Sequence, residues 1–137
     1  MEDSTPMNRT PLPSRRGHIT HKVSIGGRQR TLYLSVDEDA QPHEIFLRIK
    51  GQGCTAELVS LYDTLAKLMS LALQYDVPLA KIGEMLIGTK CAPSGPVGGH
   101  ARIKFCNSQQ DCIGRHLLVT HCHRDDLAHV TKKEETP

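Results

Sequence analysis

The feature that most constrains the fold of this chain is a change in the spacing of its apolar residues near residue 50. Before that point, apolar and polar side chains alternate in three short segments, residues 18–25, 30–36 and 43–49. Alternation with a period of two is typical of strands that bury one face, and short turns between such strands favour antiparallel pairing. The sequence therefore predicts a meander of about three antiparallel strands with one apolar face.

After the glycines at 51 and 53, the apolar spacing changes to three and four residues, which is typical of an amphipathic helix. Thr55 is the expected N-cap of this helix, which should end before Pro78 because the residue preceding a proline disfavours helical geometry. A second helix is predicted from Pro78 to Gly88 and a third over residues 108–122. The predicted fold is therefore α+β, with two to three helices packed on one face of the meander.

The length of 137 residues suits a single domain. We interpret residues 1–17 as a disordered basic arm, 18–130 as the folded domain and 131–137 as a charged tail. The net charge of +2 gives no general attraction to nucleic acid or membranes. No apolar segment is long enough to span a membrane, and the five cysteines, odd in number and without a CxxC pair, indicate reduced thiols in the cytoplasm.

The segment KGQGCT allows two interpretations. In one, the free amides at the start of the long helix, together with Lys50, Gly51, Gly53 and Thr55, hold a phosphate or another anion. In the other, the glycines only let the chain turn steeply from the sheet into the helix. The segment has neither the Walker pattern nor GxGxxG, so both interpretations stay open.

A second glycine-rich segment, APSGPVGGHARIKF, is predicted as a long loop. Its candidate ligand residues for a phosphate are Gly98, Gly99, His100, Arg102 and Lys104. Such a loop is suited to closing over a negatively charged ligand through charge-assisted contacts. The alternative is an ordinary connection between two elements.

No group of residues in the sequence indicates catalysis. The cysteines have no neighbouring base that the sequence identifies, and Asp125 and Asp126 lie in a polar run near the tail. Cys112 and His116 share a helix face and residues 121–123 read HCH, but these spacings match no standard set of zinc ligands. The residues therefore predict a protein that has no metal site and is not catalytic on its own.

Five segments, in one order along the chain, carry a resemblance to a known family: LPSRRGHITHKVSIGG, EIFLRI, LMSLALQYDVPL, PSGPVGGHARIKF and RDDLAHV. Together they resemble the C-terminal accessory region of adenosylcobalamin-dependent (class II) ribonucleotide reductases, which belongs with the TSCPD domain family. The resemblance runs from about Leu12 to Val130. The literal five-letter signature is absent, with GTKCAPSG in its neighbourhood, and the chain ends in TKKEETP instead of a cysteine-rich tail.

The resemblance implies a place in ribonucleotide reduction and in deoxynucleotide supply for DNA synthesis. In the longer enzymes the region follows a large α/β barrel that supplies the radical cysteine, the reducing cysteines, the substrate site and the cobalamin contacts. A barrel of that kind needs about 250 residues. The associated activity, ribonucleoside-diphosphate reductase, is therefore expected of a separate chain, and adenosylcobalamin is expected only by association, with no cofactor bound directly here.

Three hypotheses of function follow. The first is a free-standing, non-catalytic accessory or regulatory piece that binds the catalytic chain of a class II reductase. The second is an independent module that holds a nucleotide or another phosphorylated small molecule at the two glycine-rich segments, with a homo-oligomer able to build such a site across an interface. The third, a truncated reductase that acts alone, conflicts with the length of the chain. The first predicts a bound catalytic chain, and the second predicts a bound small molecule without one.

Overall fold

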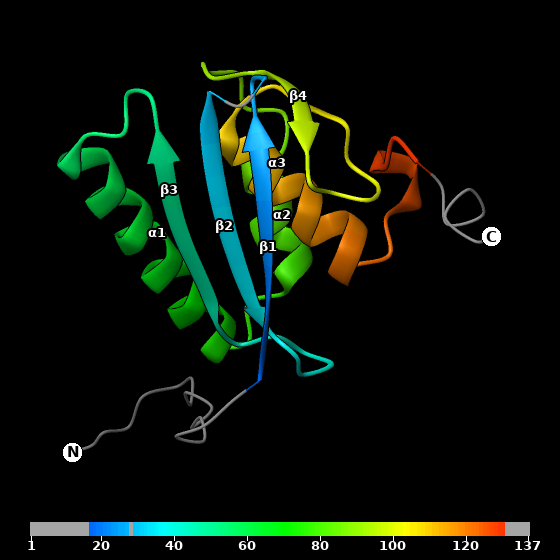
Figure 1. The fold of residues 1–137 in the computed structure, drawn as a ribbon. Helices are drawn as coiled ribbons and strands as arrows, with labels where there is room; N and C mark the ends of the chain where they lie inside the picture. Colours follow the sequence, from blue (N-terminus) through cyan, green and yellow to red (C-terminus); the bar gives the residue numbers. More distant parts are fainter. Residues whose placement is uncertain (1–16, 28, 131–137) are drawn as a thin grey trace.

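The computed structural model describes residues 17–27 and 29–130 (Figure 1). The predicted basic arm, apart from its last residue, and the predicted charged tail lie outside the described residues. The elements in chain order are β1 (His18–Ile25), β2 (Arg30–Asp37), β3 (Ile45–Gly51), α1 (Ala56–Gln74), α2 (Leu79–Leu86), β4 (Gly95–Gly98), β5 (Phe105–Cys106), α3 (Gln109–His116), a π-helical turn η1 (Leu117–His121) and a 3₁₀ turn η2 (Asp125–Leu127).

The described strands form an antiparallel sheet in the order β3-β2-β1-β4-β5. Strands β1, β2 and β3 are the predicted meander, and the α+β fold class is confirmed. The predicted count of about three strands is too low, because the segments of β4 and β5 are predicted as loop. These strands have only four and two residues, and glycine and proline are depleted in strands generally, so no alternating pattern marks them.

The helices lie on one side of the sheet (Figure 1), and alternate residues of the long strands are buried beneath them. α1 runs along β3, whereas α2 and α3 pack on each other. The buried apolar residues of the three long strands are Val23, Ile25, Leu32, Leu34, Val36, Ile45, Leu47 and Ile49. The sheet therefore has one face in the core and one face that no helix of the described residues covers, as the alternating pattern predicts.

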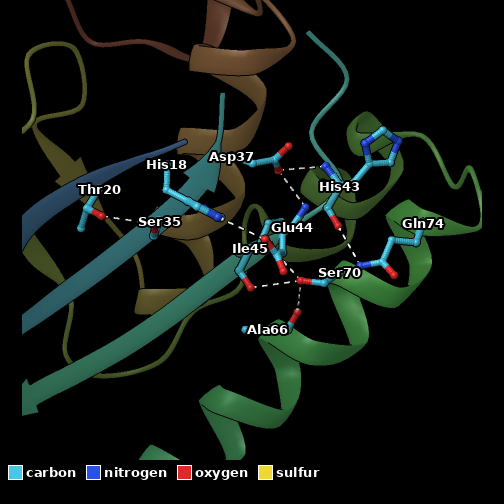
Figure 2. Close-up of polar contacts among 10 residues, drawn as sticks. All are labelled: His18, Thr20, Ser35, Asp37, His43, Glu44, Ile45, Ala66, Ser70 and Gln74. Atoms are coloured by element: carbon cyan, nitrogen blue, oxygen red, sulfur yellow. Dashed lines mark hydrogen bonds and ion pairs between the residues drawn. The ribbon is translucent and has the colours of Figure 1, made fainter. Parts of the chain in front are cut away.

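Polar side chains of α1 fix the helix to the start of β3 (Figure 2). The Ser70 hydroxyl accepts a hydrogen bond from the Ile45 N–H at 2.8 Å and donates toward the Ala66 carbonyl oxygen, also at 2.8 Å. Gln74 Nε2 donates to the carbonyl oxygen of His43 at 3.2 Å. Since β3 is an edge strand, these bonds satisfy backbone groups that no neighbouring strand pairs with.

Replacing Ser70 with alanine is expected to lower the free energy of unfolding by about 1 to 3 kcal/mol, because the Ile45 N–H would stay buried without its acceptor. Urea unfolding followed by circular dichroism measures the change. Ser60 lies exposed on the same helix, and Ser60→Ala as the matched control should change stability by less than about 0.5 kcal/mol. Equal stability of Ser70→Ala and the wild type would contradict the role given to this hydroxyl.

Two glycines set the contact between α2 and the third helical segment. A Cβ added to Gly83 would lie 2.7 Å from Leu118 Cγ, and one added to Gly114 would lie 2.7 Å from the backbone nitrogen of Ile87. The helices therefore approach so closely that any side chain at these positions would force them apart. The helix predicted over residues 108–122 is found, but it changes from α to π geometry at Leu117.

Candidate functional site

The first glycine-rich segment, residues 50–55, forms a tight corner between β3 and α1. Gly51 and Gly53 have φ angles of 120° and 76°, which favour glycine, and a Cβ at Gly51 would lie 2.6 Å from the carbonyl oxygen of Gln29. Thr55 caps α1 as predicted, because its side chain accepts a hydrogen bond from the Leu58 N–H at 3.1 Å. Glycine is thus required here by the turn itself.

Several amides of this corner already have acceptors within the chain. Three of them donate to carbonyl oxygens nearby: Gln52 to Gln29, Cys54 to Gly51 and Thr55 to Gly53. Glu57 also places a carboxylate in the first turn of α1. Few donors are left for an anion, so the predicted phosphate contacts at Lys50, Gly51, Gly53 and Thr55 stay a prediction.

The charged and histidine residues of the second glycine-rich segment make internal contacts. His100 and Arg102 are only 7% and 8% exposed. Arg102 Nη2 lies 2.8 Å from Asp125 Oδ1, and Arg102 Nε donates to the carbonyl oxygen of Val130 at 3.0 Å. Lys104 Nζ donates to the carbonyl oxygen of His100 at 2.7 Å. These contacts join the segment to the end of the described chain.

The two glycine-rich segments lie on opposite sides of β1 and β2. In the register of the sheet, Lys50 faces Thr31, and Thr31 faces Ser24. Ser24 in turn faces Gly98, after which Gly99 leaves β4 with a φ of 86°. Three strand spacings separate Lys50 from Gly98 by roughly 14 Å. The structure therefore keeps the predicted ligand residues in two groups, 50–55 and 98–104.

Four histidines from three separate parts of the sequence form a cluster within the fold. His21 belongs to β1, His100 follows β4, His116 ends α3 and His121 ends η1. The ring centroids of His21 and His100 lie 4.5 and 5.2 Å from that of His116, and the centroid of His121 lies 5.5 Å from it. Because a π turn has more residues than an α turn, it aligns residues five apart, which brings His121 to His116.

The hydrogen bonds of the cluster determine where its protons lie. His100 Nδ1 accepts from the backbone N–H groups of Arg102 and Ile103, both at 3.1 Å. The His100 proton is therefore on Nε2, which lies 3.0 Å from His116 Nδ1. His116 then carries its proton on Nε2, which is buried without a hydrogen-bond partner among the residues described.

Burial lowers the pKa of each imidazole in the cluster, because the charged form loses its hydration. The pKa of His100 falls to about 4, and His21, Lys104 and Arg102 add to the effect of burial. The pKa of His116 lies well below its ordinary value. At neutral pH the cluster is therefore uncharged, and His100 offers no positive charge to an anionic ligand.

The face of the sheet that no described helix covers gathers cations, of which Lys50 alone is among the predicted ligand residues. Lys22, Tyr33 and Arg48 occupy one cross-strand row, and Lys50 lies in the next row of β3. The Nζ atoms of Lys22 and Lys50 each lie 5.8 Å from the centroid of the Tyr33 ring. These residues occupy the polar positions of the predicted alternating strands. The alternation in the sequence could therefore have identified them as neighbours on the exposed face.

α1 leaves several leucines uncovered on the helical side of the molecule. Leu61 is 58% exposed and Leu68 is 60% exposed. Beside Leu61, a pocket of about 370 Å³ lies between α1 and the start of α3, with Tyr62, Leu65 and Gln109 in its lining. Met85 of α2 is also exposed. We call Leu61, Leu65, Leu68 and Leu71 the α1 leucine stripe.

The described part of the chain has one group of potential metal ligands and no helix able to span a membrane. None of its helices combines the length and apolar character needed to cross a bilayer. One group of residues, Asp37, Asp39 and His43, brings a ligand atom from each within 4.8 Å of the others. Asp37 Oδ1 in this group accepts hydrogen bonds from the N–H groups of His43 and Glu44, at 2.9 and 2.8 Å, which closes the turn before β3 (Figure 2).

Comparisons with known proteins give one consistent result. The model of the TSCPD domain family matches residues 6–120. A vitamin B12-dependent ribonucleotide reductase of Bradyrhizobium diazoefficiens is 36% identical over 126 residues, which are 92% of this chain and 10% of the relative. The protein of the same name from Agrobacterium fabrum is 38% identical over 124 residues, 89% of this chain and 9% of the relative.

A third vitamin B12-dependent ribonucleotide reductase, from Rhodopirellula baltica, is 31% identical over 120 residues, 88% of this chain and 11% of the relative. The chain thus spans about a tenth of the length of these curated relatives. No solved structure matches it.

Proposed function

The chain belongs to the TSCPD domain family, and from that premise we propose that it is a non-catalytic accessory or regulatory piece of a vitamin B12-dependent ribonucleotide reductase. The observation that carries the proposal is the similarity to these reductases over about nine-tenths of this chain but only a tenth of theirs. The remaining nine-tenths of such a relative would then correspond to a separate catalytic chain. Ribonucleotide reduction, and with it a cytoplasmic location, belongs to the same proposal.

The α1 leucine stripe supports a contact with such a chain. Leucines that are more than half exposed, such as Leu61 and Leu68, are costly to hydrate, and contiguous apolar surface of this kind marks interaction sites. In a longer protein the same helix would pack against a neighbouring domain, and domain interfaces within a chain resemble interfaces between chains. We therefore propose that the stripe contacts the catalytic chain.

We propose that this chain does not itself hold a corrinoid cofactor. Of the four clustered histidines, His100 and His116 are buried and hydrogen-bonded to each other, so their nitrogens are unavailable to a large ligand. The pocket beside α1 has a volume of about 370 Å³ and the one beside Pro78 about 560 Å³, volumes in the range of sites for small molecules. In our proposal cobalamin is bound by the catalytic chain alone.

Native mass spectrometry of the protein, purified gently from its own cells, tests the proposal. The expected result is a complex with a large reductase chain. Exchanging two stripe leucines for aspartate, in Leu61→Asp/Leu68→Asp, should lower the recovered complex at least about tenfold, because charge would enter an apolar interface. Lys67→Asp/Lys81→Asp, on exposed helix positions, is the control and should leave recovery unchanged. A reductase chain absent from the wild-type sample, or recovered equally with the leucine variant, would contradict the proposal.

The second candidate function, an independent module for a nucleotide or another phosphorylated small molecule, is supported by the exposed Lys50 at the corner before α1. The same mass measurement separates the two candidates, since it would detect a nucleotide-sized mass released on denaturation. A homo-oligomer would appear in the same spectrum. Lys50 is the residue to exchange in that case, because Arg102→Ala would also break the contact with Asp125 and so disturb the fold.

A further inference from the structure

The side of the sheet that no described helix covers carries charged, hydroxyl and aromatic side chains, whereas the core side is apolar. Its side chains come from the alternate strand positions that the burial pattern leaves accessible. We call this surface the outer face; its members on the long strands include Thr20, Lys22, Ser24, Thr31, Tyr33, Ser35, Phe46, Arg48 and Lys50. It combines three cations, two aromatic rings and several hydroxyl groups, and helix α1 lies on the opposite side of the sheet (Figure 1).

The cations and the rings of the outer face are interleaved. Lys22 and Arg48 flank Tyr33 in one cross-strand row, and the Nζ atoms of Lys22 and Lys50 lie 5.8 Å from the centroid of its ring. Phe46, 50% exposed, is the diagonal neighbour of Tyr33, at roughly 7 to 8 Å. The face thus presents two ring platforms, with three positive charges around the first.

The charge of the outer face is not balanced locally. Within residues 17–27 and 29–130, no carboxylate forms an ion pair with Lys22, Arg48 or Lys50. The carboxylate of Glu44 lies at the other end of the strands, where it contacts His18 at 3.1 Å. The face therefore has a local excess of three positive charges in a chain whose net charge is only +2.

We propose that the outer face binds single-stranded nucleic acid, with unpaired bases stacked on Tyr33 and Phe46 and phosphates held by Lys22, Arg48 and Lys50. An open antiparallel sheet with exposed aromatic rings is suited to unpaired bases, whose faces are free to stack. Stacking is possible with every base, and the cations follow the backbone, so the binding depends little on sequence. A duplex keeps its bases stacked internally and offers this face only its phosphates.

This inference goes beyond the proposed reductase role and uses another surface. The α1 leucine stripe and the outer face lie on opposite sides of the sheet, so one protein could use both at once. Failure of one proposal leaves the other standing, since the leucine exchanges that test the reductase contact and the exchanges on the outer face share no residue.

Fluorescence anisotropy with labelled oligothymidine and oligouridine of about twelve nucleotides tests the binding. Three phosphate contacts predict an affinity about 20-fold weaker at 200 mM than at 50 mM salt, from a slope of about 0.7 per contact for single strands. Tyr33→Leu, which keeps an apolar side chain in the half-buried position, should weaken binding about tenfold through lost stacking. A duplex of the same length should bind more weakly than either single strand.

Matched charge variants locate the site. Lys22→Gln/Arg48→Gln/Lys50→Gln should weaken binding at least about tenfold and flatten its dependence on salt. Lys67→Gln/Lys81→Gln/Lys90→Gln removes as many exposed cations elsewhere, and its affinity should stay within about threefold of the wild type. Circular dichroism confirms that each variant is folded.

Several outcomes would overturn the inference. These are no binding by the wild type at the lower salt concentration, equal losses in the two charge variants, unchanged affinity in Tyr33→Leu, or equal binding of duplex. Competition by thymidine monophosphate as effective as by oligothymidine, at equal nucleotide concentration, would also overturn it and assign the face to a small phosphorylated ligand.

Discussion

Replacing Asp111 with alanine is expected to lower the free energy of unfolding by about 3 to 5 kcal/mol, the cost of removing one partner from a buried charged network. The carboxylate is completely buried. Its Oδ1 accepts a hydrogen bond from the Gly88 N–H at 2.7 Å, and its Oδ2 accepts one from the Asn107 N–H at 2.8 Å. It also lies 3.6 Å from Nη2 of Arg115. Alanine would leave two backbone donors and a half-buried guanidinium without their acceptor.

Urea unfolding measures this loss, and hydrogen exchange at the Gly88 and Asn107 amides shows whether the expected bonds are the ones broken. Asp63→Ala is the control, because Asp63 forms only an exposed helical ion pair with Lys67, worth about 0.5 kcal/mol or less. A loss below about 1 kcal/mol for Asp111→Ala would show that water replaces the carboxylate. A large loss would explain how the chain between α2 and α3, which includes β4 and β5, is held without regular structure over much of its length.

Acidification is expected to destabilise the fold through the histidine cluster. The folded-state pKa of His100 is about 4, below the ordinary value of 6.5, and those of His21, His116 and His121 are also lowered. The unfolded chain therefore binds protons that the folded chain excludes, and stability is fully present above pH 6.5. It is lost as the pH falls toward the lowered pKa values. His100 alone predicts a loss of about 2 kcal/mol between about pH 7.5 and about pH 5.

Urea unfolding of the wild type and of variants is measured at the two pH values. The comparison separates the contribution of the histidine cluster to the pH dependence of stability from that of the carboxylates. His116→Gln removes the central ring and should flatten the dependence on pH, even if it lowers stability at neutral pH. His123→Asn, at an exposed position with a φ of 58° that asparagine tolerates, is the control and should keep the full dependence. Parallel pH profiles for the wild type and His116→Gln would exclude the cluster as the cause.

Local patterns in the sequence predict the backbone architecture well. The alternation in 18–25, 30–36 and 43–49 identifies the three long strands, since a sheet with one buried face imposes a period of two. Thr55 is found as the N-cap of α1, which ends ahead of Pro78, because both signals act through bonds within a few residues. Signals of this kind require no knowledge of distant parts of the chain.

The candidate ligand residues show where local patterns stop being informative. Lys50 is exposed, but Arg102 is buried against Asp125, and His100 contacts His116. Nothing within a few residues of Arg102 or His100 indicates these partners, which lie 23 and 16 residues away in the sequence. The role of Asp111 is not predictable for the same reason, because its carboxylate accepts a hydrogen bond from Gly88, which is distant in the sequence.

The sequence by itself determined the α+β class, the one-sided meander, the long capped helix and, through five ordered segments, the TSCPD family. Each follows from short-range periodicity, capping or motif order. Only the tertiary structure decided the two short strands, the distance between the glycine-rich segments, the histidine cluster and the row of Lys22, Tyr33 and Arg48. These depend on strand register and on packing between residues far apart in the chain, which bring side chains together without a signal in the neighbouring sequence.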